Sequence, residues 1–564
     1  MTANNCREFL LQQRNSEGFF TSGLSDSAVS TATACLALEL ADAQKYSQAI
    51  RRAREWLLSH RDQDALYGDS PESPANLTAT FLAYTALVRD PESARQTNQT
   101  REWLLQQFQD FSFPAVKKAF LEKYGRDLTF SVPILALATA AGFFPDAKAA
   151  WRDMPYFPFE AVCVPEALFR HLRLPVVSYA LPALICVGLA QQAHARRGLL
   201  RLLRSICKGK ALRVLSAKQP ESGGFLEAAP LTAFCAICLC SAGLREHPVT
   251  QKSLTFLLET QRDNGAWPID SDLNQWVTSL ALASFGQTLS AEEKFSYRNL
   301  LKEQQCKAVH PFTRAAPGGW CWTNRTGGVP DADDTAAALI ALHTLGERSS
   351  DSVRQGLCWL LDLQNRDGGL PTFCRGWGKF PFDRSSADLS AHAYKALSLY
   401  EPMLPAQLQQ RIAAAKRKIL SFLGQNQQPD GSFLPLWFGD QTAPDGLAPV
   451  YGTALVLEHL ADSGAPFLAA AVRYLLQHQH ASGGWGNPAE DGQDYVFFTA
   501  RCIRALQPYH EANAAIIRAQ AYLQPFREHP ESIPLEPVGL YFSQLWYSEK
   551  LYPAIFLASE EEQE

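Results

Sequence analysis

The stretch Gln427-Gln-Pro-Asp-Gly431-Ser-Phe433 contains the pattern that decides the fold: a Gln, a Gly four residues later and an aromatic ring six residues later. Six other segments of this 564-residue chain share its spacing, one without the ring and two in worn form: Gln219–Phe225, Gln261–Trp267, Gln479–Trp485, Gln364–Leu370, Arg14–Phe20 and Arg61–Tyr67. Such a pattern pins a turn, because Gly lets the chain reverse, Gln can bond backbone groups at helix ends, and the ring packs on its neighbours. We therefore assign these residues a structural role.

Apolar runs with helical spacing precede and follow most copies, such as FLLETQ before the Gly265 turn and VTSLALASF after it. Successive copies begin 42, 63 or 52 residues apart, at 219 and 261, at 364 and 427, and at 427 and 479. Repeats of this size built from helix pairs form stacked or closed α/α architectures. Strand signals are nearly absent, so the sequence predicts an all-α fold.

Length and composition favour two large domains with sizeable cores, because 46% of the residues are hydrophobic and 19% are charged. We expect one domain over residues 1–266 and another over 267–564, since Trp267-Pro268 separates two helix pairs. The net charge of −5 gives no electrostatic footprint for nucleic acid. The 13 cysteines are scattered and the N-terminus lacks a signal-peptide pattern, which favours a cytoplasmic setting.

Residues 172–190, LRLPVVSYALPALICVGLA, form the most apolar segment and have basic flanks. Pro175, Pro182 and Ser178 interrupt it, so a membrane-spanning helix is not expected. Two readings stay open: a buried core helix, or a patch that lies on one leaflet of a membrane.

An acidic motif, Asp331-Ala-Asp333-Asp334-Thr335, follows PGGWCW and a Gly-rich stretch and precedes the helical run AAALIALHTL. Acidic residues in a first helical turn are ordinary capping groups. Clustered carboxylates cannot all ionise comfortably, however, so at least one should hold a proton near neutral pH unless the helix N-terminus prevents it. A retained proton next to a cationic donor would make a strong general acid.

Together, the PGGW…VPDADDTA stretch and the repeats resemble class II terpene cyclases, most closely squalene–hopene cyclases, over about residues 10–555. The resemblance implies two α/α barrels in a dumbbell with a buried apolar cavity between them. It also implies a monotopic enzyme on the cytoplasmic face of a membrane, without metal or cofactor. Its substrate would be an isoprenoid such as squalene, cyclised to a hopanoid-like or partly cyclised triterpene. A homodimer is left open.

By the same resemblance, Asp333 is the proton donor and Asp331 and Asp334 support it. His392 matches the family histidine that polarises the donor. Asp388 lies four residues before His392, so the two would share a helix face and a carboxylate–imidazolium pair is reasonable. The alternative for His392 is an ordinary interior histidine. Tyr451 matches the tyrosine that contacts the acid through water.

Four aromatic residues match cavity positions of the family: Trp276, Trp322, Phe373 and Trp437. Aromatic faces stabilise a migrating positive charge without offering a nucleophile. The alternative is that these rings belong to the ordinary core. The tail around Tyr541, Trp546 and Tyr547 does not match the family's cavity tyrosines, which leaves the number of rings formed open.

Three rival functions remain. A class II diterpene cyclase would share the acid and need a cationic or magnesium-bound site for a diphosphate, for which Arg325 and Arg375 are candidates. A protein-prenyltransferase-type barrel would need zinc ligands, of which no convincing set occurs. The third rival is an inactive repeat scaffold that binds lipid or protein.

Overall fold

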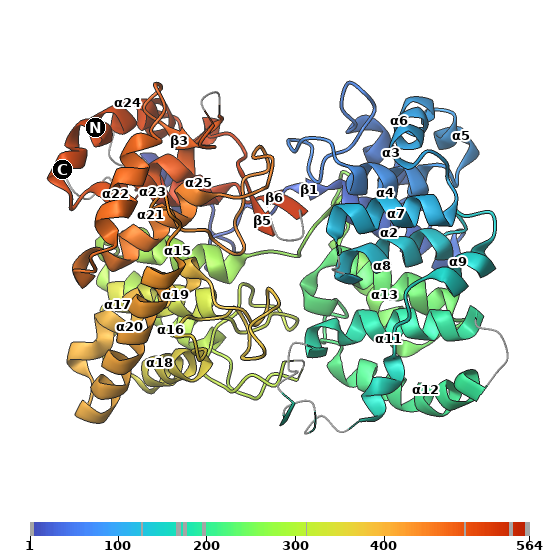
Figure 1. Cartoon of the computed structure of the whole chain (residues 1–564), viewed down its shortest axis with the longest axis horizontal. Helices are drawn as coiled ribbons and strands as arrows, with labels where there is room; N and C mark the ends of the chain where they lie inside the picture. Colours follow the sequence, from blue (N-terminus) through green and yellow to red (C-terminus); the bar gives the residue numbers. More distant parts are fainter. Residues whose placement is uncertain are drawn as a thin grey trace. The chain divides into compact units, whose positions relative to one another are not determined.

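The computed structural model describes residues 5–125, 128–164, 168, 171–172, 177–194, 199–311, 313–489, 492–540 and 545–558. The chain divides into two compact units. The C-terminal unit consists of residues 1–23, 272–324 and 328–564, and the N-terminal unit of residues 24–271 and 325–327. Both are built from helices, and the strands are short (Figure 1).

The C-terminal unit is an α/α toroid. Six inner helices pack in a closed ring, each against the next and the last against the first: α15 (Asn274–Phe285), α17 (Ala332–Thr344), α19 (Ala387–Tyr400), α21 (Pro449–Leu460), α23 (Val496–Leu506) and α25 (Leu551–Ala558). The other helices pack outside this ring: α1 (Asn5–Gln12), α16 (Ala291–Gln304), α18 (Asp351–Leu363), α20 (Ala406–Asn426), α22 (Leu468–Gln477) and α24 (Asn513–Glu528). Two short antiparallel hairpins complete the unit: β3 (Trp485–Gly486) with β4 (Asp494–Tyr495), and β5 (Pro537–Leu540) with β6 (Leu545–Ser548).

The N-terminal unit repeats this plan with five inner helices in a ring: α2 (Ala28–Asp42), α4 (Leu77–Leu87), α8 (Leu128–Ala140), α11 (Val177–His194) and α13 (Ala229–Ser241). Its other described α-helices are α3 (Ser47–Ser59), α5 (Pro91–Ala94), α6 (Asn98–Phe108), α7 (Phe113–Tyr124), α9 (Ala147–Asp153), α12 (Leu199–Lys218) and α14 (Pro248–Thr260). Strands β1 (Asp26–Ser27) and β2 (Trp267–Pro268) pair antiparallel within this unit. The predicted all-α class is confirmed.

The expected domains were residues 1–266 and 267–564. The observed N-terminal unit both starts and ends at other residues than the expected N-terminal domain. Residues 1–23 belong to the C-terminal unit because α1 packs against α24 and α25. Figure 1 places the two chain ends near α24, in agreement with this packing. The boundary near residue 267 lies at 271/272, because the pairing of β1 with β2 keeps Trp267 and Pro268 in the N-terminal unit.

The Gln–Gly–aromatic copies tie neighbouring helices together, as the copy after α20 shows. The amide nitrogen of Gln427 donates to the carbonyl oxygens of Gly431 (2.8 Å) and Phe467 (3.0 Å). The ring of Phe433 is fully buried. Its backbone N–H donates to the Thr453 hydroxyl (2.9 Å) in the first turns of α21. Each copy thus fixes the start of an inner helix.

The hydrogen bond from a repeat backbone N–H to a hydroxyl on an inner helix recurs in both units. The backbone N–H of the residue at the ring position donates to a hydroxyl on the fourth or fifth residue of an inner helix; the acceptors are Thr31, Thr80, Thr232, Thr278, Thr335, Ser390, Thr453 and Thr499. The repeat therefore includes an anchor hydroxyl. Because Thr335 closes the acidic motif, the anchor of α17 also fixes the acidic residues.

The repeat glycines allow two backbones to approach closely. Gly431 has φ +95°, and a Cβ added there would lie 2.6 Å from the Ala470 carbonyl oxygen. Gly431→Ala should lower the free energy of unfolding by about 2–4 kcal/mol, from backbone strain and steric overlap together. Gly464 also has positive φ (+65°) but open space around it, so Gly464→Ala should cost only about 1 kcal/mol. Urea unfolding of both variants checks this, and equal losses would contradict a role for the close approach.

The apolar segment 172–190 is only partly described, because residues 173–176 lie outside the described residues. In α11, Ile185, Cys186, Val187 and Leu189 are buried. None of the described helices combines the length and the apolar character that a membrane span requires.

Candidate active site

Four of the predicted site residues in the C-terminal unit share one position in the repeat. Trp276, Asp333, Asp388 and Tyr451 each lie two residues before the anchor hydroxyl of their inner helix. Since the anchors fix the starts of successive inner helices, the toroid gathers these four side chains at the same level of α15, α17, α19 and α21. The repeat thereby builds the site.

Sequence reasoning missed the fifth member of this set, Phe497, which lies two residues before Thr499 on α23. The Phe497 ring contacts Tyr451 (ring centroids 5.8 Å apart) and Tyr552 (5.3 Å). The anchor hydroxyl is the signal that could have found it.

Asp333 and His392 form the central contact. His392 Nδ1 lies 2.5 Å from Asp333 Oδ1, which joins α17 to α19. The Asp333 side chain is 20% exposed, whereas that of His392 is 6% exposed. Asp333 Oδ2 makes no hydrogen bond to a described residue. Asp333 is therefore held at one oxygen and accessible at the other.

Asp331 and Asp334 flank Asp333 in the acidic motif, and unlike Asp333 both are buried. Asp331 caps α17, because its Oδ1 accepts from the backbone N–H of Asp334 (2.8 Å). Burial, followed by the charge of Asp331, raises the pKa of Asp334 well above its usual range. Burial also raises the pKa of Asp331, against the hydrogen bonds from Asp334 that lower it. The pair therefore holds a proton at neutral pH, as expected from clustered carboxylates.

The expected pairing of Asp388 with His392 is wrong. Asp388 Oδ1 accepts from the Ser386 hydroxyl, and Oδ2 accepts from the backbone N–H of Leu436 (3.2 Å). Both oxygens are thus engaged at the start of α19, while His392 turns toward Asp333 on the neighbouring helix. Burial, followed by the charge of Asp333, raises the pKa of Asp388 to about 7.

Tyr451 is fully buried. Its hydroxyl lies 3.2 Å from that of Tyr552, and the Arg501 guanidinium lies over its ring, 5.3 Å from the centroid. The predicted contact of Tyr451 with the acid through water stays a prediction.

Three of the four predicted cavity rings form one cluster. Phe373 makes edge contacts with Trp322 (ring centroids 6.4 Å apart) and Trp437 (5.6 Å). The Trp437 indole N–H donates to the Thr372 hydroxyl (2.7 Å), which fixes that ring. The fourth ring, Trp276, lies edge-on to His392 at 6.3 Å. Of the four rings, Trp276 is thus the one that contacts the Asp333–His392 pair directly, through His392. Of the unassigned tail residues, Trp546 and Tyr547 lie on β6, and Tyr541 lies outside the described residues.

The match to protein families agrees with this arrangement. The family model of the squalene–hopene cyclase C-terminal domain matches residues 276–519, and that of the prenyltransferase α/α toroid domain matches residues 1–137. The chain belongs to the class II terpene cyclase family. The matched C-terminal segment contains every predicted site residue of the chain.

Individual relatives are distant. Enfumafungin synthase of Hormonema carpetanum is 29% identical over 30% of this chain and 14% of its own length. Ent-copalyl diphosphate synthase of Streptomyces sp. (strain KO-3988) is 28% identical over 40% of this chain and 39% of its own. The chain thus matches less than half the length of either relative. The solved structure of ent-copalyl diphosphate synthase from Streptomyces platensis matches with a TM-score of 0.60 and 19% identity. The match covers 96% of this chain and 95% of that one, which shows a shared fold.

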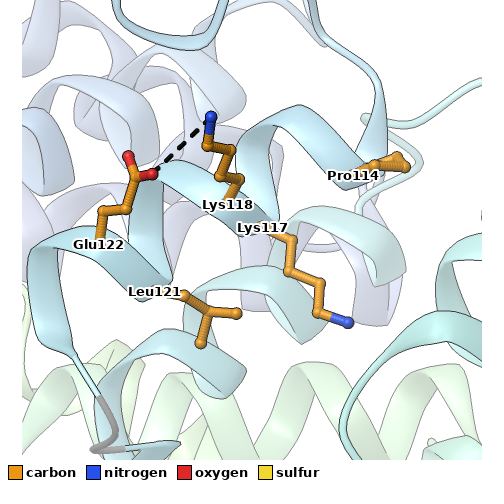
Figure 2. Close-up of a pocket in the computed structure, with 5 residues that line it drawn as sticks. All are labelled: Pro114, Lys117, Lys118, Leu121 and Glu122. Atoms are coloured by element: carbon orange, nitrogen blue, oxygen red, sulfur yellow. Dashed lines mark ion pairs between the residues drawn. The ribbon is translucent and has the colours of Figure 1, made fainter.

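Other features of the protein do not involve these residues. Figure 2 shows a pocket on α7 of the N-terminal unit, lined by Pro114, Lys117, Lys118, Leu121 and Glu122, none of which is a predicted site residue. Within the described ranges, no group of three or more His, Cys, Asp or Glu side chains is placed to hold a metal ion. Arg325 lies in the N-terminal unit, near Glu227, and Arg375 is exposed in the C-terminal unit.

Asp388 should give the stability of the protein a pH dependence. An unfolded aspartate has a pKa of about 3.9, whereas that of Asp388 is about 7 in the fold. The unfolded chain therefore releases this proton first, and the contribution is complete below about pH 4 and is lost as the pH rises through about 7. Asp388→Asn should flatten the fall in unfolding free energy over this range, by about 4 kcal/mol at most.

Urea unfolding midpoints at pH 5 and pH 8 measure this effect. Asp462→Asn is the matched control, since the Asp462 side chain is 94% exposed. An Asp388→Asn variant with the same pH dependence as this control would contradict the predicted titration.

Proposed function

We propose that this cyclase protonates the terminal double bond of squalene or a related polyprenoid and guides the resulting cation through ring closure. The contact between Asp333 and His392 carries this proposal, because an acid with one oxygen bound to an imidazole and the other accessible can deliver a proton. The family model of the squalene–hopene cyclase C-terminal domain supports the substrate class.

In this mechanism, the imidazolium of His392 donates its Nδ1–H to Asp333 Oδ1 and stabilises the carboxylate that remains when Oδ2 gives up its proton. The substrate double bond takes that proton and leaves a carbocation. Asp331 and Asp334, which share a retained proton, limit the negative charge next to the donor. Asp388 keeps the start of α19, and with it His392, in place.

The ring cluster of Trp322, Phe373 and Trp437 would stabilise the cation after protonation. Aromatic faces attract positive charge and supply no nucleophile, and a dry site keeps water from quenching the cation. The product would be a hopanoid-like or partly cyclised triterpene, formed without metal or cofactor.

A location on the cytoplasmic face of a membrane is part of the proposal, because an apolar substrate is drawn from a bilayer. Two exposed apolar side chains of the N-terminal unit support it: Leu172, 49% exposed, and Ile206 on α12, 74% exposed. The homodimer stays a prediction.

A prenyl diphosphate is the second candidate substrate. It is favoured by the relative named ent-copalyl diphosphate synthase. Such a substrate needs cations for its diphosphate, and Arg325 and Arg375 are the residues to test. The inactive lipid-binding scaffold is the remaining alternative.

One assay separates these functions: squalene and geranylgeranyl diphosphate are offered in parallel, in detergent and without added Mg²⁺, with products read by mass spectrometry. A cyclised squalene isomer or its hydrate is expected, and its ring count would define the product class. Turnover of the diphosphate alone would replace squalene by a diterpene precursor. Turnover of neither substrate by folded protein would favour the scaffold.

A further inference from the structure

A second histidine lies directly against the proposed polarising histidine. The ring of His459 on α21 stacks on that of His392, with centroids 4.8 Å apart and planes 10° from parallel. Trp276 touches His392 edge-on at 6.3 Å. The imidazole of His392 therefore has a ring on α21 and another on α15 against it, while its Nδ1 meets Asp333 on α17.

A histidine at position 459 destabilises the fold relative to an apolar side chain of similar size. Its Nε2 is buried and has no hydrogen-bond partner among the described residues, so the fold bears the desolvation cost of that atom. An apolar side chain would fill the same space without this cost. Burial, followed by repulsion from the positive charges of His392 and Arg501, holds the pKa of His459 well below its usual range. His459 is therefore an uncharged, flat ring.

Among the described residues, the charged group that pairs with His392 is Asp333. Glu458, next to His459, pairs with Arg501 (2.8 Å) and Arg504 (2.5 Å) on α23. Glu458 thus forms ion pairs with both arginines, and its charge acts on His392 without a direct contact. The contacts that orient His392 are therefore Asp333 at its Nδ1 and the rings of His459 and Trp276.

We infer that His459 is a positioning residue, whose flat face holds the His392 imidazole with Nδ1 directed at Asp333. The face of an uncharged aromatic ring also favours an imidazolium in contact with it. The inference rests on the proposed function, because it assigns His459 to the acid that the function uses. His459 acts through His392 and does not contact the substrate.

Three variants test this role. His459→Ala removes the stacking face and should lower kcat about tenfold to a hundredfold with little change in KM, because a small misplacement of a catalytic group has effects of this size. His459→Phe restores a flat ring without nitrogen and should recover most of the rate. His343→Ala is the matched control: His343 lies on α17 and contacts the ring of Tyr400.

A second measurement does not depend on the substrate. The short Asp333–His392 contact should give a far-downfield Nδ1–H proton signal in the NMR spectrum, assigned by its loss in His392→Gln. We expect this signal in the wild type, in His459→Phe and in His343→Ala, and its loss or broadening in His459→Ala. This result would support positioning even if neither squalene nor geranylgeranyl diphosphate were turned over, a failure that would concern the proposed function alone.

Two outcomes would overturn the inference. One is a folded His459→Ala variant that keeps both the downfield signal and, where the wild type is active, its kcat. The other is a folded His459→Phe variant that loses the signal as fully as His459→Ala, which would show that the flat face is not what His459 provides. Thermal unfolding of each variant establishes that it is folded.

Discussion

Asp333→Asn should abolish turnover of the accepted polyprenoid while the fold stays intact. Asn has nearly the same shape as Asp and can keep the contact with His392 Nδ1 that joins α17 to α19. It has no acidic proton to deliver to a double bond. Loss of a general acid alone costs about 10²–10⁴ in rate, and an alkene offers no other route to the first cation, so the rate should fall below detection. Product formation from squalene, read by mass spectrometry, measures it.

Asp351→Asn is the matched control for this variant. Asp351 begins α18 as Asp333 lies in the first turn of α17, and it is 77% exposed and makes no contact with Asp333 or His392. The same chemical change at the same place in a helix should leave turnover unchanged. A fully active, folded Asp333→Asn variant would exclude Asp333 as the donor, and with it the proposed mechanism.

Most of the fold could be predicted from the repeat. The Gln–Gly–aromatic spacing predicts helix pairs, and the side-chain bonds from Gln427 to Gly431 and Phe467 show why the spacing is four residues. The copy at Gln305 does not have the four-residue spacing and was therefore not predicted. Its amide donates to the carbonyl oxygens of Gly318 (2.8 Å) and Ser352 (2.9 Å), but a long loop separates Gln305 from its glycine. Local spacing cannot detect a repeat that contains an insertion.

Contacts between distant segments were beyond sequence reasoning. The first 23 residues join the C-terminal unit through the packing of α1 against α24 and α25, more than 500 residues away in the chain. The stacking of His459 on His392 likewise depends on the packing of α19 against α21. Residues that share one helix, such as Asp388 and His392, suggested a pair from their spacing. Their actual partners are set by the neighbouring helices and by the start of α19.

The acidic motif shows what sequence could and could not supply. Its three carboxylates predict a retained proton, and burial of Asp331 and Asp334 places that proton behind the donor. Resemblance to the family singled out Asp333, and the structure gives the physical distinction: only Asp333 combines a partly exposed side chain with a histidine contact. Neither the spacing DxDD nor composition contains the information that separates the three.

His392→Ala should lower the rate by about two to four powers of ten, because the carboxylate formed on proton transfer would lose the imidazolium that stabilises it. The fold should survive, since the anchor Ser390 and the bonds of Asp388 still fix the start of α19. Initial rates with squalene over a range of concentrations give kcat and KM separately. The loss should fall on kcat, because His392 meets the acid and is 6% exposed.

The outcome for His392→Ala also separates two roles of the histidine. If His392 only packs, an alanine there would lower stability and leave the rate of the folded protein unaltered. If it polarises Asp333, the rate falls while His343→Ala, which removes a histidine on α17 outside this contact, keeps it. The variant removes the hydrogen bond between His392 and Asp333 Oδ1, but Asp333 itself remains present and accessible. A residual rate above that of Asp333→Asn is therefore expected, and its size measures what the imidazole adds to the acid.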